Sequence, residues 1–267
     1  MSSARRGRLR LRADARGAHL AETRWRQGDQ PAWLWVAVTT GVTVCVVRWS
    51  RGGHVARELL GQTFAGILVT DRSSAYHWYP GRWRQLCWAH LLRDFEAMRG
   101  RGGSSEALGE ALLGQAYQMF PWWHRVREGT LQGSTCRSYM TPLRREGERL
   151  LEVGRGCEVP KTAETCRDIL KRRQALGTCV QVDGVEPTKN TAERAIRPGV
   201  LWRKGSGGTQ SAKGSRFVES MLTVVSTLKQ QQRNVLAYLM EACDAALHGE
   251  AAPSLLPPHT QQAQAAA

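Results

Sequence analysis

The order of apolar runs in the first part of the chain constrains the fold more than any other feature of the sequence. Residues 18–50 are strand-like and are divided by turn signals at residues 28–29 and 39–41, which predicts three antiparallel strands. Apolar residues at helical spacing follow over residues 54–60. A short, continuously apolar run then ends in Asp71, which is typical of a strand buried on both faces. This order predicts an α/β fold built on a mixed sheet.

The sequence after Asp71 is predominantly helix-forming. Residues 85–98 carry a stripe of apolar side chains, and residues 99–180 are rich in Leu, Glu and Arg, which predicts a helix followed by a mostly helical insert. Residues 181–183 are interpreted as a short extended piece. The next predicted helix is capped by Thr188 and is ended by Pro198 after residue 197.

We therefore expect one large domain between two tails. The domain covers residues 18–250 and contains the helical insert at about residues 99–180. The arginine-rich residues 1–17 and the Pro-, Gln- and Ala-rich residues 251–267 are expected to be disordered tails. A glycine-rich loop and two amphipathic helices complete the domain at residues 204–214, 217–228 and 235–247.

The charge of the chain favours a polyanionic partner. Its 38 Lys and Arg residues exceed its 23 Asp and Glu residues, which gives a formal net charge of +15, and each phosphate that such a surface neutralises releases counterions. DNA or RNA fits this excess best, while an acidic membrane surface or an ordinary basic protein is the alternative. The most apolar stretch, residues 32–47, is too short and too broken to span a membrane as a helix.

Cysteine use and the N-terminal sequence indicate the cytoplasm. The seven cysteines are odd in number and scattered, and the chain begins with an arginine run instead of the apolar core of a secretory signal. We therefore expect reduced thiols in a cytoplasmic protein.

Two carboxylates are candidates for chemistry. Asp71 stands at the end of a buried strand, where a rigid element can hold a side chain in a cleft, although a turn or capping aspartate is an equal alternative. Glu193 stands four residues before Arg197, and a surface ion pair on a helix is the simplest account of that spacing.

Several motifs in a fixed order, however, resemble the insertion-sequence-66 family of bacterial transposases, which are of the DDE type. The resemblance extends from about His19 to Leu247. It is carried by the segments Gly66-Ile67-Leu68-Val69-Thr70-Asp71-Arg72, Gln85-Leu86-Cys87-Trp88-Ala89-His90-Leu91-Leu92-Arg93-Asp94-Phe95, Asn190-Thr191-Ala192-Glu193-Arg194 and Trp202-Arg203-Lys204-Gly205-Ser206.

The resemblance implies a fold, a reaction and partners. The fold is a ribonuclease-H-like mixed five-stranded sheet with flanking helices and an α-helical insert. The reaction is Mg²⁺-dependent phosphodiester cleavage and strand transfer, in which three carboxylates hold two metal ions. Asp71 is then the second carboxylate and metal ligand, and Glu193 the third. DNA is the partner, a homo-oligomer forms on it, and the protein associates with the bacterial nucleoid.

The first carboxylate of the family is missing from this sequence. Family members carry Asp-Glu-Thr followed shortly by Trp, whereas this chain reads Leu20-Ala21-Glu22-Thr23-Arg24-Trp25. Ala21 takes the place of the aspartate, and Glu22 would point to the opposite face of the strand. We therefore expect impaired catalysis in a copy that is truncated at its N-terminus. The alternatives are an inactive DNA-binding remnant and a nuclease that does not mobilise DNA.

Cys87 and His90 are three residues apart and face the same side of a predicted helix. Zinc would need about four ligands, and no second pair at a suitable spacing is present, so a packing pair is the favoured interpretation. The resemblance implies active-site support, with His90 contacting the scissile phosphate or a carboxylate.

A set of cations is expected to bind DNA. Four of them flank the glycines of the predicted loop, where backbone N–H groups can approach phosphates, and a flexible solvated loop is the equal alternative. Two more lie on the helix of Glu193. The six residues are Arg194, Arg197, Arg203, Lys204, Lys213 and Arg216.

Overall fold

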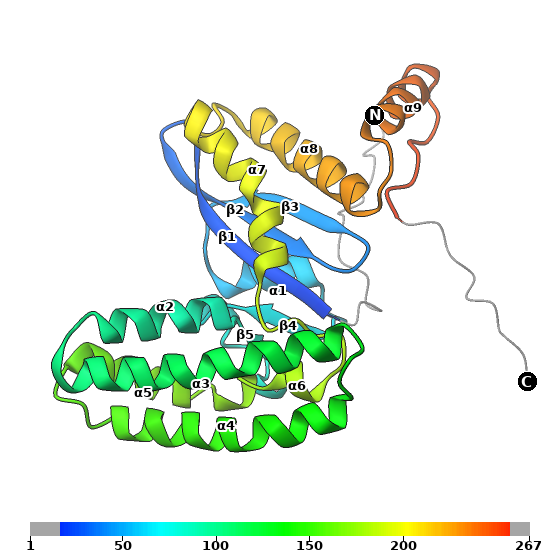
Figure 1. Cartoon of the computed structure of the whole chain (residues 1–267). Helices are drawn as coiled ribbons and strands as arrows, with labels where there is room; N and C mark the ends of the chain where they lie inside the picture. Colours follow the sequence, from blue (N-terminus) through cyan, green and yellow to red (C-terminus); the bar gives the residue numbers. More distant parts are fainter. Residues whose placement is uncertain (1–16, 257–267) are drawn as a thin grey trace, which may run out of the picture. The chain divides into compact units, whose positions relative to one another are not determined.

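The computed structural model describes residues 17–256, which form parts of two compact units (Figure 1). The first unit contains residues 17–66 and 190–256, and the second contains Ile67–Lys189. The predicted N-terminal tail lies outside the described residues except for Gly17, which begins a strand. Of the predicted C-terminal tail, only residues 251–256 are described.

The first unit begins with the predicted antiparallel meander. Its strands are β1 (Gly17–Gln27), β2 (Gln30–Val38) and β3 (Thr43–Arg48), and both pairings are antiparallel. The tight turn between β1 and β2 uses Gly28 at φ 58°, a conformation that glycine adopts without steric cost. The helices of this unit are α1 (Gly53–Leu60), α7 (Asn190–Ser206), α8 (Ala212–Gln230) and α9 (Val235–His248).

Helix α8 protects the free edge of β3. The backbone N–H groups of Thr43 and Cys45 donate to the hydroxyls of Thr227 and Thr223 at 3.1 and 3.0 Å. The N–H of Val47 donates to the Glu219 carboxylate at 2.6 Å. Because an open strand edge otherwise invites pairing with another chain, these side chains satisfy the edge and fix α8 along it.

Helix α7 is longer than the sequence predicts. Pro198 does not end it but lies inside it, and the helix continues to Ser206 into the predicted loop. A proline costs the helix one backbone hydrogen bond, but Ile196 and Gly199 on either side of it are buried. Burial of this face, which Val200 extends, outweighs the local cost.

The second unit combines two short strands with a helical bundle. The strands are β4 (Ile67–Thr70) and β5 (Arg84–Leu86), which pair in parallel. The long helices are α2 (Trp88–Arg99), α3 (Gly103–Arg127), α4 (Gly133–Gly154) and α5 (Pro160–Leu170). Two predictions were wrong here: Gln85 lies in β5 instead of a helix, and residue 181 ends the short helix α6 (Thr178–Gln181) instead of an extended piece.

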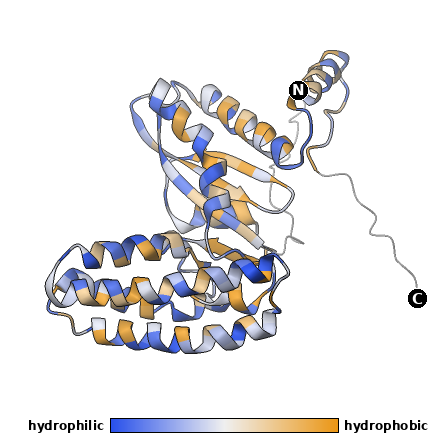
Figure 2. Cartoon of the chain, viewed as in Figure 1, coloured by the Kyte–Doolittle hydropathy of each residue, from blue (hydrophilic) through white to orange (hydrophobic). Residues whose placement is uncertain are grey.

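All five strands belong to one mixed sheet in the order β3-β2-β1-β4-β5. The predicted α/β class with a mixed five-stranded sheet and an α-helical insert is confirmed, and it is consistent with a ribonuclease-H-like fold. The long helices carry apolar and polar residues on different faces (Figure 2). None of the helices within residues 17–256 is long and apolar enough to cross a membrane.

The cysteines give a prediction that tests the packing of the chain. All seven are free, and burial raises the pKa of Cys45 and Cys179 to about 12, so these thiols stay protonated and inert. In the native chain at roughly pH 8, Ellman's reagent should react first with the exposed Cys243 and more slowly with the half-buried Cys157. The other five should react only after unfolding. Rapid native labelling of Cys45 or Cys179, mapped by mass spectrometry, would contradict the packing.

Candidate functional site

Asp71 follows β4 directly and lies in a prearranged polar environment. Its Oδ1 accepts a hydrogen bond from the backbone N–H of Ser73 at 2.9 Å, and its Oδ2 accepts one from the Lys189 ammonium at 2.8 Å. Burial raises the pKa of Asp71, but the charge and hydrogen bond of Lys189, together with the Ser73 N–H, lower the pKa more, so it lies below its ordinary value. The carboxylate is therefore ionised, and both of its oxygens are engaged.

Lys189 is held in place by its backbone as well as by its charge. Its side chain is only 6% exposed, and its backbone N–H donates to Cys87 Sγ at 3.2 Å. Two residues earlier, the Pro187 carbonyl accepts a hydrogen bond from the Trp88 N–H at 2.9 Å. The segment before α7 is thus fixed on the first turn of α2. The role of Lys189 could not be predicted from the sequence, because a lysine in a polar run carries no sign of burial.

A network of charged side chains surrounds the end of β4. Arg72 pairs with Asp94 on α2 at 2.6 Å and with Asp168 on α5 at 2.5 Å. Arg172 also pairs with Asp168 and donates to the His77 ring. These ion pairs connect two helices of the bundle to Arg72, the residue that follows Asp71, and they stabilise the position of Arg72.

Arg84 adds a buried cation beneath the same strand end. It is 3% exposed, and its Nη2 donates to the Thr70 hydroxyl and to the Asp71 carbonyl at 3.1 and 3.2 Å. Burial, and then repulsion from Arg172, lower the pKa of Arg84 to about 10. It remains a cation at neutral pH, so the surroundings of Asp71 are rich in positive charge.

Cys87 and His90 lie beside Asp71 within the second unit. Cys87 caps α2, and its backbone N–H donates to the Thr70 carbonyl at 2.8 Å. Burial raises the pKa of the Cys87 thiol, so it is a neutral acceptor for the N–H of Lys189. His90, half-buried on α2, is close enough to contribute to the low pKa of Asp71. Cys87 thus links α2 to both the strand end and Lys189, and the packing role of the Cys87–His90 pair stays a prediction.

Ala21 lies on the face of β1 that packs against α7. It is 3% exposed and pairs with Val36 of β2. Its apolar cluster includes Ala192 and Ile196 of α7, which stand one residue before and three residues after Glu193. The side chain at position 21 is therefore buried among methyl groups near the first turn of α7, and it supplies no metal ligand.

Glu22 is paired with Arg51 and lies away from Ala21. Its side chain is 1% exposed, and it forms an ion pair with Arg51 at 2.9 Å. Since neighbouring residues of a strand point to opposite faces, Glu22 lies on the face of β1 opposite Ala21. A bulge that would exchange the two is absent from the β1–β2 register, which is continuous from His19 to Gln27.

Glu193 occupies the first turn of α7 and is half-buried. It belongs to the first unit, as Ala21 does, whereas Asp71 belongs to the second. Within the described residues, no group of three or more His, Cys, Asp and Glu side chains could hold a metal ion. Two bound Mg²⁺ ions, with Asp71 and Glu193 among their ligands, remain a prediction.

The predicted DNA-binding cations all lie on α7 or α8. Five of the six are exposed: Arg194, Arg197, Lys204, Lys213 and Arg216. The sixth, Arg203, is half-buried and donates to the Thr23 hydroxyl and the Arg24 carbonyl at 3.2 and 2.7 Å. Arg203 therefore anchors α7 to β1.

The turn between α7 and α8 is fixed to the end of β1. Thr209 donates its N–H to the Arg26 carbonyl at 3.0 Å and accepts from the Gly28 N–H at 2.7 Å. Its hydroxyl accepts a hydrogen bond from the buried Trp25 indole at 3.2 Å. These contacts hold the backbone between Lys204 and Lys213 in a defined conformation.

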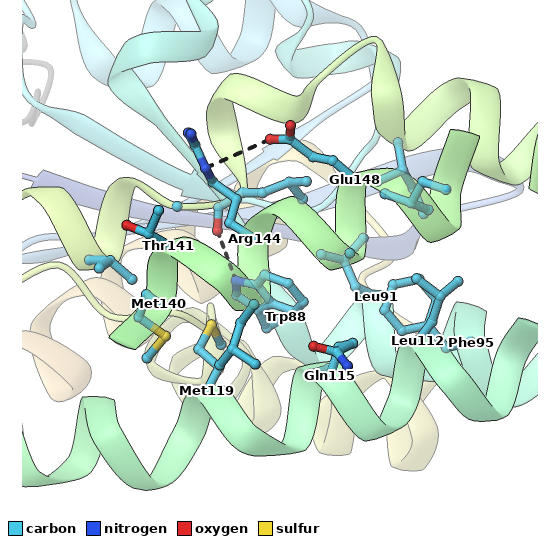
Figure 3. Close-up of a pocket in the computed structure, with 18 of the residues that line it drawn as sticks. Trp88, Leu91, Phe95, Leu112, Gln115, Met119, Met140, Thr141, Arg144 and Glu148 are labelled. Carbon is cyan, nitrogen blue, oxygen red and sulfur yellow. Dashed lines mark hydrogen bonds and ion pairs between the residues drawn. The ribbon is translucent and has the colours of Figure 1, made fainter. Parts of the chain in front are cut away.

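A cavity of about 240 Å³ lies in the helical bundle of the second unit (Figure 3). Its lining is mainly apolar and includes Trp88, Leu112, Met119 and Met140. The Trp88 indole donates to the Leu176 carbonyl at 2.9 Å. Asp71, Cys87 and His90 are not among its lining residues, so the cavity is separate from the carboxylate.

Comparison with known proteins places this geometry in context. The sequence matches the family described as "Transposase IS66 family" over residues 9–216. It is also 30% identical over 240 residues to an uncharacterized protein, y4qI, of Sinorhizobium fredii (strain NBRC 101917 / NGR234). That match covers 79% of this chain and 43% of the relative, so the chain spans less than half the relative's length. No solved structure matches the chain.

Proposed function

Because the chain belongs to the IS66 family of transposases, as its motifs predict, we propose that it acts on DNA in insertion-sequence transposition with impaired metal-dependent cleavage and strand transfer. Membership of the family supports DNA as its partner. In an intact member, two Mg²⁺ ions would activate the attacking oxygen and stabilise the leaving oxygen of a phosphodiester. In this chain the proposed remaining ligands are Asp71 and Glu193.

The proposal rests on the presence of alanine, and not a carboxylate, at position 21. A carboxylate there would face the first turn of α7, whereas Ala21 is closed in by an apolar cluster that includes Ala192 and Ile196. The nearest acidic neighbour in the chain, Glu22, is bound to Arg51 on the opposite face. Replacement by local rearrangement would break this ion pair, in which the Glu22 side chain is 1% exposed and Arg51 is half exposed. Two carboxylates are too few for the two-metal site.

DNA binding is proposed to use the exposed cations of α7 and α8. Replacement of Lys204 and Lys213 by alanine should weaken binding of a DNA duplex, with little preference for sequence. It should also reduce the slope of log affinity against log salt by about 1 for each phosphate that the chain no longer neutralises. Fluorescence anisotropy over a salt series measures both effects.

The matched control for this prediction is Lys161→Ala/Lys171→Ala, which removes two exposed charges from the second unit. If the double variant Lys204→Ala/Lys213→Ala binds with the same affinity and salt slope as the control, the α7–α8 turn does not bind phosphates.

Binding and cleavage measured on the same sample test the proposed function. With a duplex that carries the element's terminal repeats, and with Mg²⁺ or Mn²⁺, we expect a salt-sensitive complex without nicked or joined strands. Efficient nicking and joining by the unaltered chain would contradict impairment. Nicking without joining would favour a nuclease of the same fold. Absence of any DNA complex would contradict the proposed action on DNA.

A further inference from the structure

The charge balance around Asp71 differs from that of a metal site. Around the end of β4 four cations face three carboxylates, and they are Arg72, Arg84, Arg172 and Lys189 against Asp71, Asp94 and Asp168. The carboxylates that bind a divalent cation in proteins normally leave an excess of negative charge for the ion to neutralise. Here the excess is positive before any ion arrives.

Lys189 is the cation in direct contact with Asp71. Its Nζ is 2.8 Å from Oδ2, and the two side chains are 6% and 16% exposed. The remaining oxygen, Oδ1, already accepts the N–H of Ser73. A metal ion that approached Asp71 would have to displace the ammonium or bind within a few ångströms of it, and at that distance two like charges repel strongly in a partly buried site.

The cations around Asp71 are fixed in place, so the excess of positive charge cannot be lowered by moving them away. Arg72 and Arg172 are held by Asp94 and Asp168. Arg84 is buried under the strand, and its Nη2 donates to one hydroxyl oxygen and one backbone oxygen. Lys189 is also fixed through its backbone to Cys87. Swinging Nζ away from Asp71 would leave a carboxylate partly buried without its ion-pair partner.

We propose that Lys189 is a built-in counter-ion that takes the place of a divalent cation at Asp71. Asp71 is then neutralised by the chain itself and has low affinity for Mg²⁺ or Mn²⁺ in the isolated protein. The inference rests on the proposed function only in treating Asp71 as the family's second carboxylate. It concerns metal affinity and requires neither DNA nor cleavage.

Paramagnetic broadening by Mn²⁺ tests this inference. In the full chain labelled with ¹⁵N, the amide signals of Asp71 and Ser73 are followed as Mn²⁺ is added. Lys189→Met removes the charge and keeps an unbranched side chain, and it should lower the Mn²⁺ concentration for half-broadening at least about tenfold. Lys189→Arg, which keeps the charge, should behave like the unaltered chain, and so should Lys161→Met.

Addition of Asp71→Asn to Lys189→Met should abolish the gain in Mn²⁺ affinity. The inference is overturned if the unaltered chain broadens at the same Mn²⁺ concentration as Lys189→Met, or if the gain survives Asp71→Asn. The amide spectrum itself reports folding, and if Lys189→Met is unfolded, Lys189→Gln gives the same comparison. Strong broadening of the unaltered chain at micromolar Mn²⁺ that is lost in Asp71→Asn would also overturn the inference. Because no DNA is present, failure here is distinguishable from failure of the proposed function.

Discussion

Replacement of Ala21 by aspartate should restore Mn²⁺-dependent nicking of a plasmid that carries the element's terminal repeats. The new carboxylate would stand on the β1 face that packs against α7, beside the neighbours of Glu193 in the same cluster. Loss of a residue that only supports a metal ligand commonly costs 10–100-fold in activity or metal affinity. Restoration of a ligand itself should therefore raise the nicking rate by at least about 100-fold over the unaltered chain.

The same substitution should make stability depend on metal. Without metal, Ala21→Asp places a charge among buried methyl groups and should lower the melting temperature. A metal ion that binds only the folded state offsets this loss, so Mn²⁺ should raise the melting temperature of Ala21→Asp more than that of the unaltered chain. Differential scanning fluorimetry with and without Mn²⁺ measures the difference.

Two controls separate chemistry from packing. Ala21→Asn has nearly the size of Ala21→Asp but lacks its charge, and should remain inactive. Glu22→Gln, added to Ala21→Asp, should leave the restored activity in place because Glu22 lies on the other face of β1. An Ala21→Asp protein that is folded, binds DNA and nicks no faster than the unaltered chain would show that position 21 is not what limits cleavage.

Replacement of Gly208 by alanine should destabilise the first unit strongly. Gly208 has φ 124°, and a Cβ placed there would lie 2.3 Å from the Arg26 carbonyl oxygen. The obstacle is backbone of β1, and the turn is fixed to it through Thr209, so neither side can yield cheaply. Backbone strain and overpacking each cost about 1–3 kcal/mol, which gives a loss on the order of 3–5 kcal/mol in the free energy of unfolding.

Gly207→Ala is the matched control for this prediction. Gly207 also has a positive φ, 73°, but nothing lies within 4 Å of a Cβ built there. Its cost should be limited to the left-handed backbone, about 1 kcal/mol. Urea unfolding followed by tryptophan fluorescence measures the free energy of unfolding of both variants. Equal destabilisation by the two variants would mean that the close approach of Gly208 to β1 does not form.

The antiparallel meander and the buried strand before Asp71 follow from the sequence because their patterns are local. Alternating residues and turn signals define β1 to β3, and a continuous apolar run defines β4. The two faces of β1 follow in the same way, so the opposite orientations of Ala21 and Glu22 could be predicted from the alternation of strand side chains.

Other features depend on contacts that no local pattern reveals. Gln85 belongs to β5 because it pairs with Val69 of β4, although residues 85–98 carry the apolar stripe of an amphipathic helix. Pro198 is accommodated because α7 buries Ile196 and Gly199. Lys189 reaches Asp71 from a position 118 residues later in the chain, and neither the charge nor the spacing of a single lysine predicts such a partner.

The ion pair of Lys189 also bears on the restoration experiment. If Lys189 competes with metal at Asp71, its removal should add to the effect of Ala21→Asp, and the double variant Ala21→Asp/Lys189→Met should reach half of its maximal nicking rate at lower Mn²⁺ than Ala21→Asp alone. Lys189→Met alone should not restore nicking, because position 21 still lacks a carboxylate.

The most direct test of the account asks whether position 21, Asp71 and Glu193 serve one reaction. The measurement is the initial rate of Mn²⁺-dependent nicking by Ala21→Asp, alone and with Asp71→Asn or Glu193→Gln added. We predict restored nicking by Ala21→Asp and its loss, to the level of the unaltered chain, with either addition. Restored nicking that persists when Asp71 or Glu193 is neutralised would contradict the account.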